Sequence, residues 1–450
     1  MTTELKRDLG LFSCTMLVIG NIIGVGIFTT PGEIAQGLPS AGWVLVAWLI
    51  GGFMATTGAL TYAEMGAMFP KAGGNYVFLR EAYGPLVAFL YGWAYTLVTS
   101  TGTIALLAIG FAEYLGMPTG SFNSKAFSIA VVFILTVLNA RDLKLGASVM
   151  DGITSTKVVA MLILVGAGFL IGNGNVGHFS PVFTGEATGI FTAIAAALVP
   201  MAFTYSGWNS TVLVAEEVKN PEKMIPVSLI MGTLATTAIY ILMNAVYLYA
   251  VPLQQLVGEV KIAHLAAANL FGEGTTRLIQ ILVATSVLGC LSASLLANPR
   301  TTFALGRDGL FFRFTGVVHP KFQTPSGAIW FQGLWACVLI ALGKFEQILI
   351  LVSVPLVIIA SMTVFSIFIF RKKYPDMHRP YRCWGYPVIP IIYIVISLAM
   401  LVVKFNQRSQ QYLTFETFQL GIPMSYLGLG IFILGIPVYY LWRRFYLKTR

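Results

Sequence analysis

Charged residues are scarce in this sequence. Only 10% of its 450 residues are Asp, Glu, Lys or Arg, whereas 57% are hydrophobic. A soluble chain carries about 25% charged residues, and a chain of this length would form about three soluble domains. Because so few charges cannot cover three soluble surfaces, most of the surface is expected to face lipid.

Cysteine is rare as well. The four cysteines, Cys14, Cys290, Cys337 and Cys383, are scattered and form no CxxC pair. This pattern argues against a disulfide framework and against a zinc site. The sequence also lacks a Walker A motif and any long hydrophilic segment, so ATP-driven transport by this chain is not expected. We predict neither a metal nor another cofactor.

Histidine is absent from the apolar runs. The four histidines, His178, His264, His319 and His378, all fall between these runs. A membrane enzyme or a haem-bearing electron carrier, the first alternative, needs ligands or catalytic groups inside the membrane. We therefore expect a protein that is not an enzyme. The net charge of +10 does not suggest nucleic acid, because the cations follow the membrane topology.

Long apolar runs dominate the chain, and a run of about 20 residues can cross a bilayer as a helix. The alternation with period two that is typical of barrel strands is absent. The sequence predicts an all-α integral membrane protein, one transmembrane domain over 1–450. The first span is expected to be retained, because no cleavage site follows it. The twelve predicted spans are 11–30, 42–69, 85–115, 126–140, 152–172, 190–214, 226–251, 276–298, 326–342, 346–370, 386–403 and 423–442.

The cationic residues divide unevenly between the two sides of these spans. The segments on the side of the N-terminus hold 21 of the 28 Lys and Arg residues, the other side holds 6, and Lys157 belongs to neither. Positive residues are enriched in cytoplasmic loops. We therefore predict a multi-pass protein of the cell membrane with both termini in the cytoplasm.

Two of the predicted spans are interrupted in the middle. Residues 20–28 read GNIIGVGIF, and residues 203–209 read FTYSGWN. One interpretation of the first segment is close helix packing through Gly20 and Gly24. Paired interruptions at matching positions favour a second interpretation, an inverted-repeat transporter. Freed N–H groups bind a carboxylate and freed carbonyls bind an ammonium, which together suit an α-amino acid.

Further motifs follow in a fixed order along nearly the whole chain. They are GVGIF at 24–28, YAEMGAMFPKAGG at 62–74, LREAYGP at 79–85, EEVKNPE at 216–222, PR at 299–300, RDGL at 307–310, HPK at 319–321, RPYR at 379–382 and GYP at 385–387. With these motifs the chain resembles the amino acid–polyamine–organocation (APC) transporters, and within them the bacterial relatives of the L-type amino acid transporters. The resemblance implies a LeuT-like five-plus-five inverted repeat with broken helices 1 and 6. Its parts would be 11–172, 190–370 and, for helices 11 and 12, 386–442.

The resemblance implies that backbone N–H groups of the first break hold the substrate carboxylate. The matching positions are Val25 and Gly26, with Gly24 permitting the turn. Val25 stands where the family usually has Ser or Thr, so a hydroxyl contact to the carboxylate is missing. Carbonyls would receive the α-ammonium, at Ile22, Phe203, Thr204 and Ser206. Phe203 matches the aromatic gate of the family, although a packed aromatic is the alternative.

The resemblance also bears on substrate class. Several cation-exchanging relatives carry an acid at the position of Asn209, and no Asp or Glu is expected at mid-depth in the central spans. We therefore expect small to medium neutral L-amino acids. The side-chain pocket is assigned to Val98, Thr99 and Thr103 in span three and to Ser353 and Leu356 in span ten. A cationic amino acid or polyamine antiporter remains the alternative.

Lys157, near the predicted start of span five, has two interpretations. Its ammonium could reach the membrane surface, as lysines near helix ends do. Alternatively, as in many sodium-independent relatives, the ammonium would occupy a sodium position between spans one and eight. The expected contacts are a carbonyl near Gly20 and the hydroxyl of Ser286 or Ser292. Proton coupling through Lys157 is a hypothesis.

The function implied by the resemblance is secondary active transport by alternating access, as sodium-independent exchange or as proton-linked uptake. An amino acid sensor built on the transporter fold is a further alternative. The expected partners are the amino acid and the lipid bilayer. Light chains of the L-type group bond a heavy subunit through a Cys between spans three and four, but residues 117–125 contain none. A disulfide-linked heavy subunit is therefore not expected.

Overall fold

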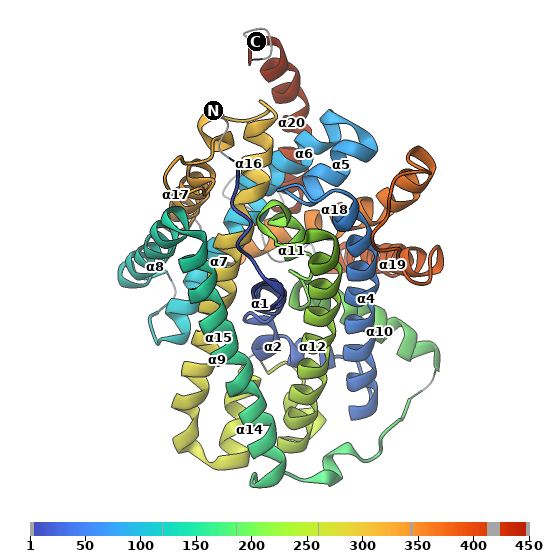
Figure 1. Cartoon of the computed structure of the whole chain (residues 1–450). Coiled ribbons are helices and arrows are strands. Elements are labelled where there is room, and N and C mark those ends of the chain that lie inside the picture. The colour runs from blue at the N-terminus through green and yellow to red at the C-terminus, as the bar shows by residue number, and fades with distance from the viewer. Residues whose placement is uncertain are drawn as a thin grey trace.

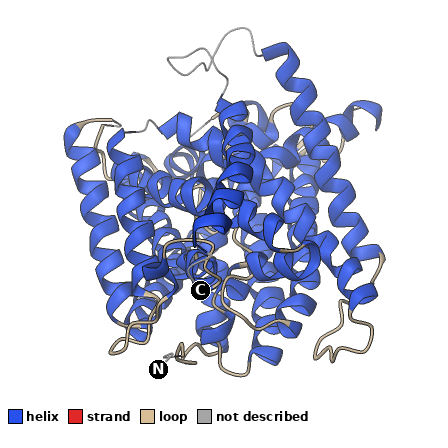
Figure 2. Cartoon of the chain, turned by 90° about the horizontal axis from the view of Figure 1, so that it is seen from above, coloured by secondary structure: helices blue, strands red, loops and turns tan. Residues whose placement is uncertain are grey.

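The structure is a computed structural model that describes residues 4–118, 120–185, 187–259, 261–342, 345–411 and 424–446. Side chains are described for all of these except 187–188, 345–356, 403–411, 424–429, 431–432 and 445–446. The described chain is helical, with no β-strand (Figure 2). An isolated β-bridge joins Leu9 to Val218.

The first half of the chain contains nine α-helices, a π-helical turn and a short 3-10 helix. They are α1 (Leu11–Ile22), α2 (Gly26–Thr29), α3 (Pro31–Ala35), α4 (Ala41–Met68), α5 (Asn75–Tyr83), α6 (Pro85–Ala94), η1 (Tyr95–Thr99), α7 (Ser100–Tyr114), α8 (Phe122–Arg141), α9 (Leu143–Leu170) and η2 (Val176–Phe179).

The second half continues in the same way. It comprises α10 (Ala187–Thr204), α11 (Ser210–Leu213), η3 (Ala215–Glu217), α12 (Pro221–Ala250), α13 (Leu253–Leu256), α14 (Ile262–Phe271), η4 (Glu273–Thr275), α15 (Thr276–Ala297), α16 (Pro299–Arg307), η5 (Arg313–Gly316), α17 (Ser326–Leu342), α18 (Phe345–Lys373), α19 (Val388–Gln411) and α20 (Met424–Tyr446).

Each of the twelve predicted spans overlaps a helix of the structure. Within the described residues, seven helical segments are long and apolar enough to cross a membrane, and shorter apolar helices accompany them. A helix satisfies its own backbone hydrogen bonds, which is the requirement for a segment surrounded by lipid. The chain is therefore a multi-pass membrane protein, as predicted.

Helix α1 lies at the centre of the molecule (Figure 1) and packs against α9, α12 and α15. Helix α4 packs along α12, while α7 contacts α15, α8 and α17. Seven of the twelve residues of α1 are buried, among them the small residues Cys14 and Gly20. This burial puts the interrupted first span inside protein, where irregular backbone can be tolerated.

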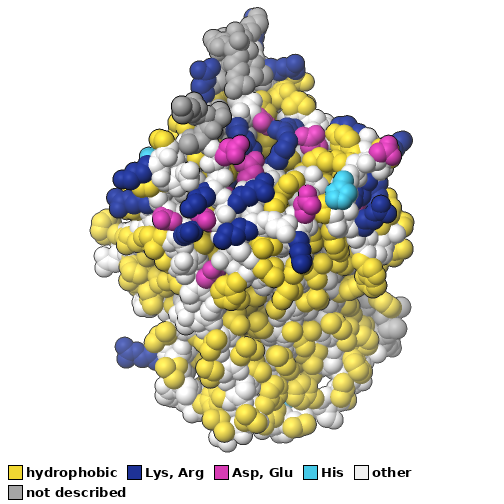
Figure 3. All heavy atoms as spheres, in the orientation of Figure 1, with side chains coloured by type: hydrophobic (Ala, Val, Ile, Leu, Met, Phe, Trp, Pro, Cys, Tyr) yellow, Lys and Arg dark blue, Asp and Glu magenta, His cyan; other side chains and the backbone are white. Residues whose placement is uncertain are grey.

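Both termini lie at the same end of the molecule (Figure 1). On the face shown in Figure 3, Lys, Arg, Asp and Glu side chains gather at this end, while the rest of the surface is mainly hydrophobic. We call it the charged end; it carries Arg80, Arg300 and Arg371 and their acidic partners. This segregation is typical of a protein whose apolar belt faces lipid.

The boundary predicted for span five needs correction. Helix α9 begins at Leu143 rather than near 152, because the Asp142 side chain caps it by accepting from the N–H groups of Lys144 and Leu145. Lys157 therefore lies in the middle of a helix of 28 residues, not near its start.

Candidate functional site

The first helix break lies between α1 and α2. Helix α1 ends at Ile22, Ile23 is extended, and Gly24 donates back to the Ile22 carbonyl at 2.9 Å. The helix resumes at Gly26. Glycine at 24 and 26 suits this turn, because a Cβ on Gly26 would lie 2.9 Å from the Thr204 hydroxyl and 3.1 Å from Thr204 Cα.

The second break follows α10, which ends at Thr204. Gly207 has φ of +100°, a conformation that favours glycine. A Cβ on Gly207 would lie 2.8 Å from the carbonyl carbon and oxygen of Asn21. The two breaks, some 180 positions apart in sequence, therefore cross in direct backbone contact.

Tyr240 of α12 joins the two breaks. Its hydroxyl lies 2.9 Å from the Ile22 carbonyl and 3.1 Å from the Thr204 carbonyl, and the side chain is fully buried. Its ring packs edge-on against Trp48 and against Tyr205. The hydroxyl has one proton, so it donates to one carbonyl at a time and can exchange between them.

The backbone N–H groups expected to hold a carboxylate are free of backbone partners. The Val25 N–H donates to no described backbone group. Gly26 is the first residue of α2, so its N–H has no partner within that helix. Val25 is partly exposed. Unsatisfied donors beside an accessible side chain could bind an anionic group.

The carbonyls expected to receive an ammonium differ in how many hydrogen bonds they already accept. The Ile22 carbonyl accepts from Gly24 and lies within reach of Tyr240, while the Phe203 carbonyl accepts from the N–H and the hydroxyl of Ser206. The Ser206 carbonyl accepts from no described group. Because a carbonyl has two lone pairs, Ser206 and Thr204 retain more capacity here than Ile22 and Phe203.

Phe203, Ser206 and Asn209 are partly exposed although they lie in the interrupted region of the sixth predicted span. Thr204 is buried, and its hydroxyl lies 2.9 Å from that of Thr30 and donates to the Pro200 carbonyl. The gate role predicted for Phe203 stays a prediction.

Span three contains a π-helical turn at the predicted pocket. Val98 and Thr99 belong to η1, and Trp335 donates to the Leu97 carbonyl at 2.9 Å. Such turns occur frequently at functional sites. Thr99 is buried and its hydroxyl has no partner, whereas Val98 is partly exposed. Ser353 and Leu356 lie in α18, but their side chains are outside the described residues.

Lys157 is fully buried, so it does not reach the membrane surface. Its ammonium donates to the carbonyls of Gly20 at 3.0 Å and Ile23 at 2.5 Å, at the end of α1. The expected hydroxyl contact is not formed, because Ser286 and Ser292 both lack a hydrogen-bond partner. Gly289 of α15 lies there instead, and a Cβ on it would be 3.2 Å from the ammonium.

The charged end is fastened by ion pairs between helix termini. Arg300 is bidentate to Glu217 at 2.7 and 2.8 Å, and both side chains are buried. The N–H groups of Asp8 and Leu9 donate to the Glu217 carbonyl, which ties the N-terminal segment to the same point. Glu64 is bidentate to Arg371. These contacts join segments that are far apart in sequence.

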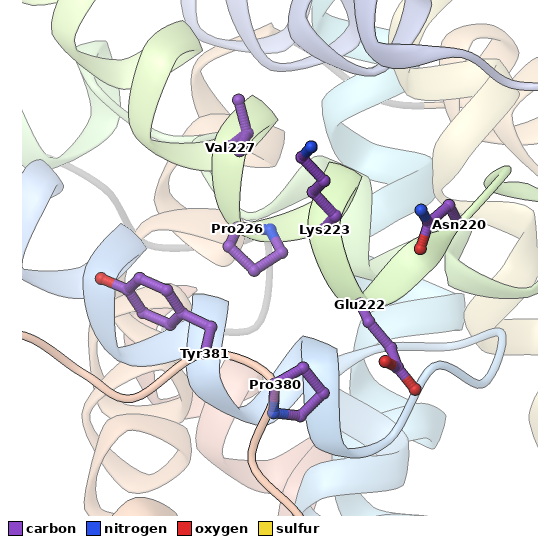
Figure 4. Close-up of a pocket in the computed structure, with 7 residues that line it drawn as sticks. All are labelled: Asn220, Glu222, Lys223, Pro226, Val227, Pro380 and Tyr381. Carbon is purple, nitrogen blue, oxygen red and sulfur yellow. The ribbon is translucent and has the colours of Figure 1, made fainter.

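A pocket of about 360 Å³ is lined by residues that belong to neither break (Figure 4). It lies between the start of α12 and the segment before α19, and Glu222 and Lys223 give it charges of both signs. Burial raises the pKa of the Tyr381 hydroxyl, which also lines it. None of the predicted site residues lies in this pocket.

Two contributors to the site were missed by sequence reasoning. Tyr240 lies in an apolar helix with no motif around it. Asn75 begins α5, and its side-chain oxygen accepts from Asn209 Nδ2 at 3.1 Å. Asn75 directly follows the motif at 62–74, which assigns it no contact. Nothing in the sequence signals either pairing.

Comparisons with known proteins agree with this architecture. The family model described as "Amino acid permease" matches residues 9–434. The serine/threonine exchanger SteT of Bacillus subtilis (strain 168) is 33% identical, over 88% of this chain and 91% of its own. The mouse b(0,+)-type amino acid transporter 1 is 29% identical, over 93% of this chain and 87% of its own. The human cystine/glutamate transporter is 27% identical, over 94% and 85%.

The predicted resemblance is thereby confirmed, since the match spans both helix breaks and the motifs at the charged end. The chain belongs to the amino acid permease family of the APC superfamily, related to the L-type transporters, and is a membrane transport protein for amino acids rather than an enzyme.

Proposed function

We propose that this protein exchanges small to medium neutral L-amino acids across the cell membrane by alternating access, independently of sodium. The observation that carries the proposal is the direct crossing of the two helix breaks at Gly207 and Asn21. The crossing brings free N–H donors and free carbonyl acceptors together deep within the helices. The name of the relative SteT, an exchanger, supports exchange.

The proposed architecture has twelve spans in two inverted five-helix repeats, followed by two further helices. The overlap of all twelve predicted segments with helices supports the count. The correspondence of the breaks after Ile22 and after Thr204 supports the repeat, because paired broken helices are typical of such transporters.

We propose that the substrate zwitterion lies across the two breaks. The N–H groups of Val25 and Gly26 would hold its carboxylate. Its ammonium would meet the carbonyls of Thr204 and Ser206, which keep free acceptor capacity. Phe203, partly exposed at the end of α10, would cover the bound substrate.

A neutral substrate is supported by the charges around the breaks. The described residues at the crossing include no carboxylate, and the side chain at the specificity position is the amide of Asn209. The described ion-paired carboxylates lie at the charged end. A cationic side chain would lack a partner in a site of this kind, which is costly inside a membrane.

Lys157 is proposed to take the place of a sodium ion. Its ammonium bridges the end of α1 to α15, where it bonds two carbonyls and packs on Gly289. A fixed positive charge at this position would remove the need for a bound cation. Transfer of a proton from Lys157 during the cycle is the proton-linked version of the proposal.

The charged end is proposed to be cytoplasmic, following the distribution of Lys and Arg. Its ion pairs would then close the cytoplasmic side in this conformation. We also propose that the protein works without a disulfide-linked heavy subunit. The burial of Cys14, Cys290 and Cys383, with Cys337 partly buried, supports this proposal.

Counterflow into liposomes tests the proposed function. The purified protein is reconstituted, the liposomes are loaded with unlabelled alanine, and uptake of labelled alanine, serine, leucine or arginine is measured with and without sodium. We expect uptake of the neutral amino acids to require the internal amino acid and to be unaffected by sodium.

Three outcomes would contradict the proposal. Preferential uptake of arginine would indicate a cationic exchanger. Strict dependence on sodium would remove the role given to Lys157. Thermal stabilisation by neutral amino acids without any uptake would indicate a sensor.

A further inference from the structure

The side chain of Asn209 does not cap the helix that it precedes. Asn209 occupies the N-cap position of α11, where an Asn side chain normally accepts from a backbone N–H of the first turn. It makes no such capping bond. Its Nδ2 instead donates to Oδ1 of Asn75 at 3.1 Å. The side chain therefore bonds to a residue 134 positions away instead of capping its own helix.

Asn75 is held firmly enough to direct this contact. It is 5% exposed and is the first residue of α5. Gly73 and Gly74 precede it with positive φ values of 103° and 45°. The Gly73 N–H donates to the Leu213 carbonyl at 2.9 Å, and a Cβ on Gly74 would meet the side chain of Val212 at 2.8 Å. The loop is thus fastened directly to α11.

The second polar atom of the Asn75 amide has its own neighbour. The Tyr62 hydroxyl is buried and lies beside both Thr363 and Asn75, without a hydrogen bond of normal geometry to either. It can accept from Asn75 Nδ2. This arrangement leaves Asn75 Oδ1 directed at Asn209, because an amide presents its donor on one side and its acceptor on the other.

As a consequence, the oxygen of the Asn209 amide remains available as an acceptor. Nδ2 gives one of its two hydrogens to Asn75, while Oδ1 bonds to no described group and the residue remains partly exposed. The Ser206 hydroxyl donates its one proton to the Phe203 carbonyl at 2.6 Å, so its oxygen is available only as an acceptor. The polar side chains at this side of the break therefore present oxygen lone pairs, which match a substrate group that donates a hydrogen bond.

We propose that Asn75 is a positioning residue for the substrate site: it fixes the Asn209 amide with its oxygen toward the break, and so selects amino acids with a side-chain hydroxyl. The inference rests on the proposed function and names the substrate class within it. The α-ammonium has the Thr204 and Ser206 carbonyls, which leaves Asn209 Oδ1 for the side chain.

The test compares threonine with valine, which have nearly the same shape but differ in one hydroxyl. Inhibition constants of both are measured against labelled alanine uptake in liposomes. The unaltered protein should favour threonine by roughly 3- to 10-fold, the factor that one net hydrogen bond supplies. Asn75→Leu should bring the ratio close to one, because the Asn209 amide is then free to turn.

Two further variants separate positioning from folding. Asn75→Asp keeps an acceptor for Asn209 Nδ2 and should keep the threonine preference. Asn209→Ala should abolish the preference by itself, and adding Asn75→Leu to it should change the ratio no further. If Asn75→Leu does not fold, Asn209→Ala and Asn75→Asp still give both arms of the test.

The outcomes are distinguishable from failure of the proposed function. An unaltered protein that carries no neutral amino acid would overturn the function itself. A protein that carries alanine but does not prefer threonine would overturn only this inference. An Asn75→Leu variant that weakens threonine and valine equally would reduce Asn75 to a structural role and also overturn it.

Discussion

At the scale of single residues, the site depends on polar atoms that are shared between helices. The Tyr240 hydroxyl serves two carbonyls on two different breaks, and the Lys157 ammonium serves two carbonyls at the end of one helix. An unpaired polar group in a buried position costs about 1–3 kcal/mol. Loss of either side chain should therefore destabilise the backbone conformation of the breaks.

Tyr240→Phe should lower the rate of amino acid uptake, because the Ile22 and Thr204 carbonyls lose their common donor. We expect roughly a tenfold loss of kcat/KM, corresponding to about 1.4 kcal/mol. Tyr247→Phe is a matched control on the same helix, since the Tyr247 hydroxyl is equally buried but has no hydrogen-bond partner. Equal losses in the two variants would contradict the bridging role.

Lys157→Met should abolish uptake and reduce the stability of the folded protein. The variant keeps the length of the side chain but leaves the carbonyls of Gly20 and Ile23 without their donor, at about 1–3 kcal/mol for each. Thermal unfolding in detergent and uptake in liposomes measure the two effects. Lys125→Met serves as the control, since the partly exposed Lys125 also donates to a carbonyl, that of Ala341. Normal uptake by Lys157→Met would refute the proposed role.

At the scale of elements, the breaks exist because glycine permits a close backbone crossing. Gly207 combines a positive φ with a contact to the Asn21 backbone that leaves no room for a methyl group. The irregular backbone around it is surrounded by α1, α12 and α15 rather than by lipid. Burial inside protein therefore allows the backbone to lack helical hydrogen bonds at this depth, which contact with lipid would not.

Gly207→Ala should reduce uptake strongly while the protein still reaches the membrane. A left-handed conformation costs a residue with a Cβ about 1–2 kcal/mol, and the clash with Asn21 adds to this. Gly110→Ala is the control: Gly110 lies inside α7 with nothing near its Cβ position, so alanine there should be neutral or stabilising by up to about 1 kcal/mol. Full activity of Gly207→Ala, measured by counterflow, would show that the crossing is not needed.

At the scale of the whole molecule, charge pairs join segments that are far apart in sequence at the charged end. The buried Glu217–Arg300 pair joins the end of η3 to the start of α16, and the N-terminal segment bonds to the same loop. In the proposed alternating-access cycle, these contacts break when this end opens. The stability of the pair therefore bears on the balance between conformations.

Glu217→Gln should shift that balance toward opening of the charged end. Removing one member of a buried pair leaves the other charge uncompensated, at about 3–5 kcal/mol. The measurement is maleimide labelling of Cys14, which is fully buried in α1, identified by peptide mass spectrometry. Faster labelling is expected.

The neighbouring pair provides the control for this experiment. Glu216 and Arg307 form a bidentate pair that is more exposed, and pairs of this kind contribute about 0–1 kcal/mol. Glu216→Gln should leave Cys14 labelling unchanged. Unchanged labelling in Glu217→Gln would mean that the buried pair does not hold this end closed.

Much of the fold could be predicted from the sequence because it depends on local features. Apolar runs must form helices in lipid, so all twelve predicted segments overlap helices. Both breaks were visible as glycine and polar residues inside such runs. Lys157 stood out because no loop could account for it, although its depth in α9 was misjudged, since the cap at Asp142 lengthens the helix by a turn or more.

Tertiary structure decided which atoms meet at the site, apart from the contact of Lys157 with the Gly20 carbonyl, which the family resemblance implied. Tyr240 contacts Ile22 across 218 positions, and Asn75 contacts Asn209 across 134. Ser286 and Ser292 were equally plausible partners of Lys157 by position, yet Gly289 lies there instead. The sequence determined a helical membrane transporter with two broken spans, because backbone hydrogen bonding in lipid allows only helices and closed barrels, and the apolar runs lack the alternation of barrel strands. The pairings followed from helix packing, whose angles and register no local pattern encodes.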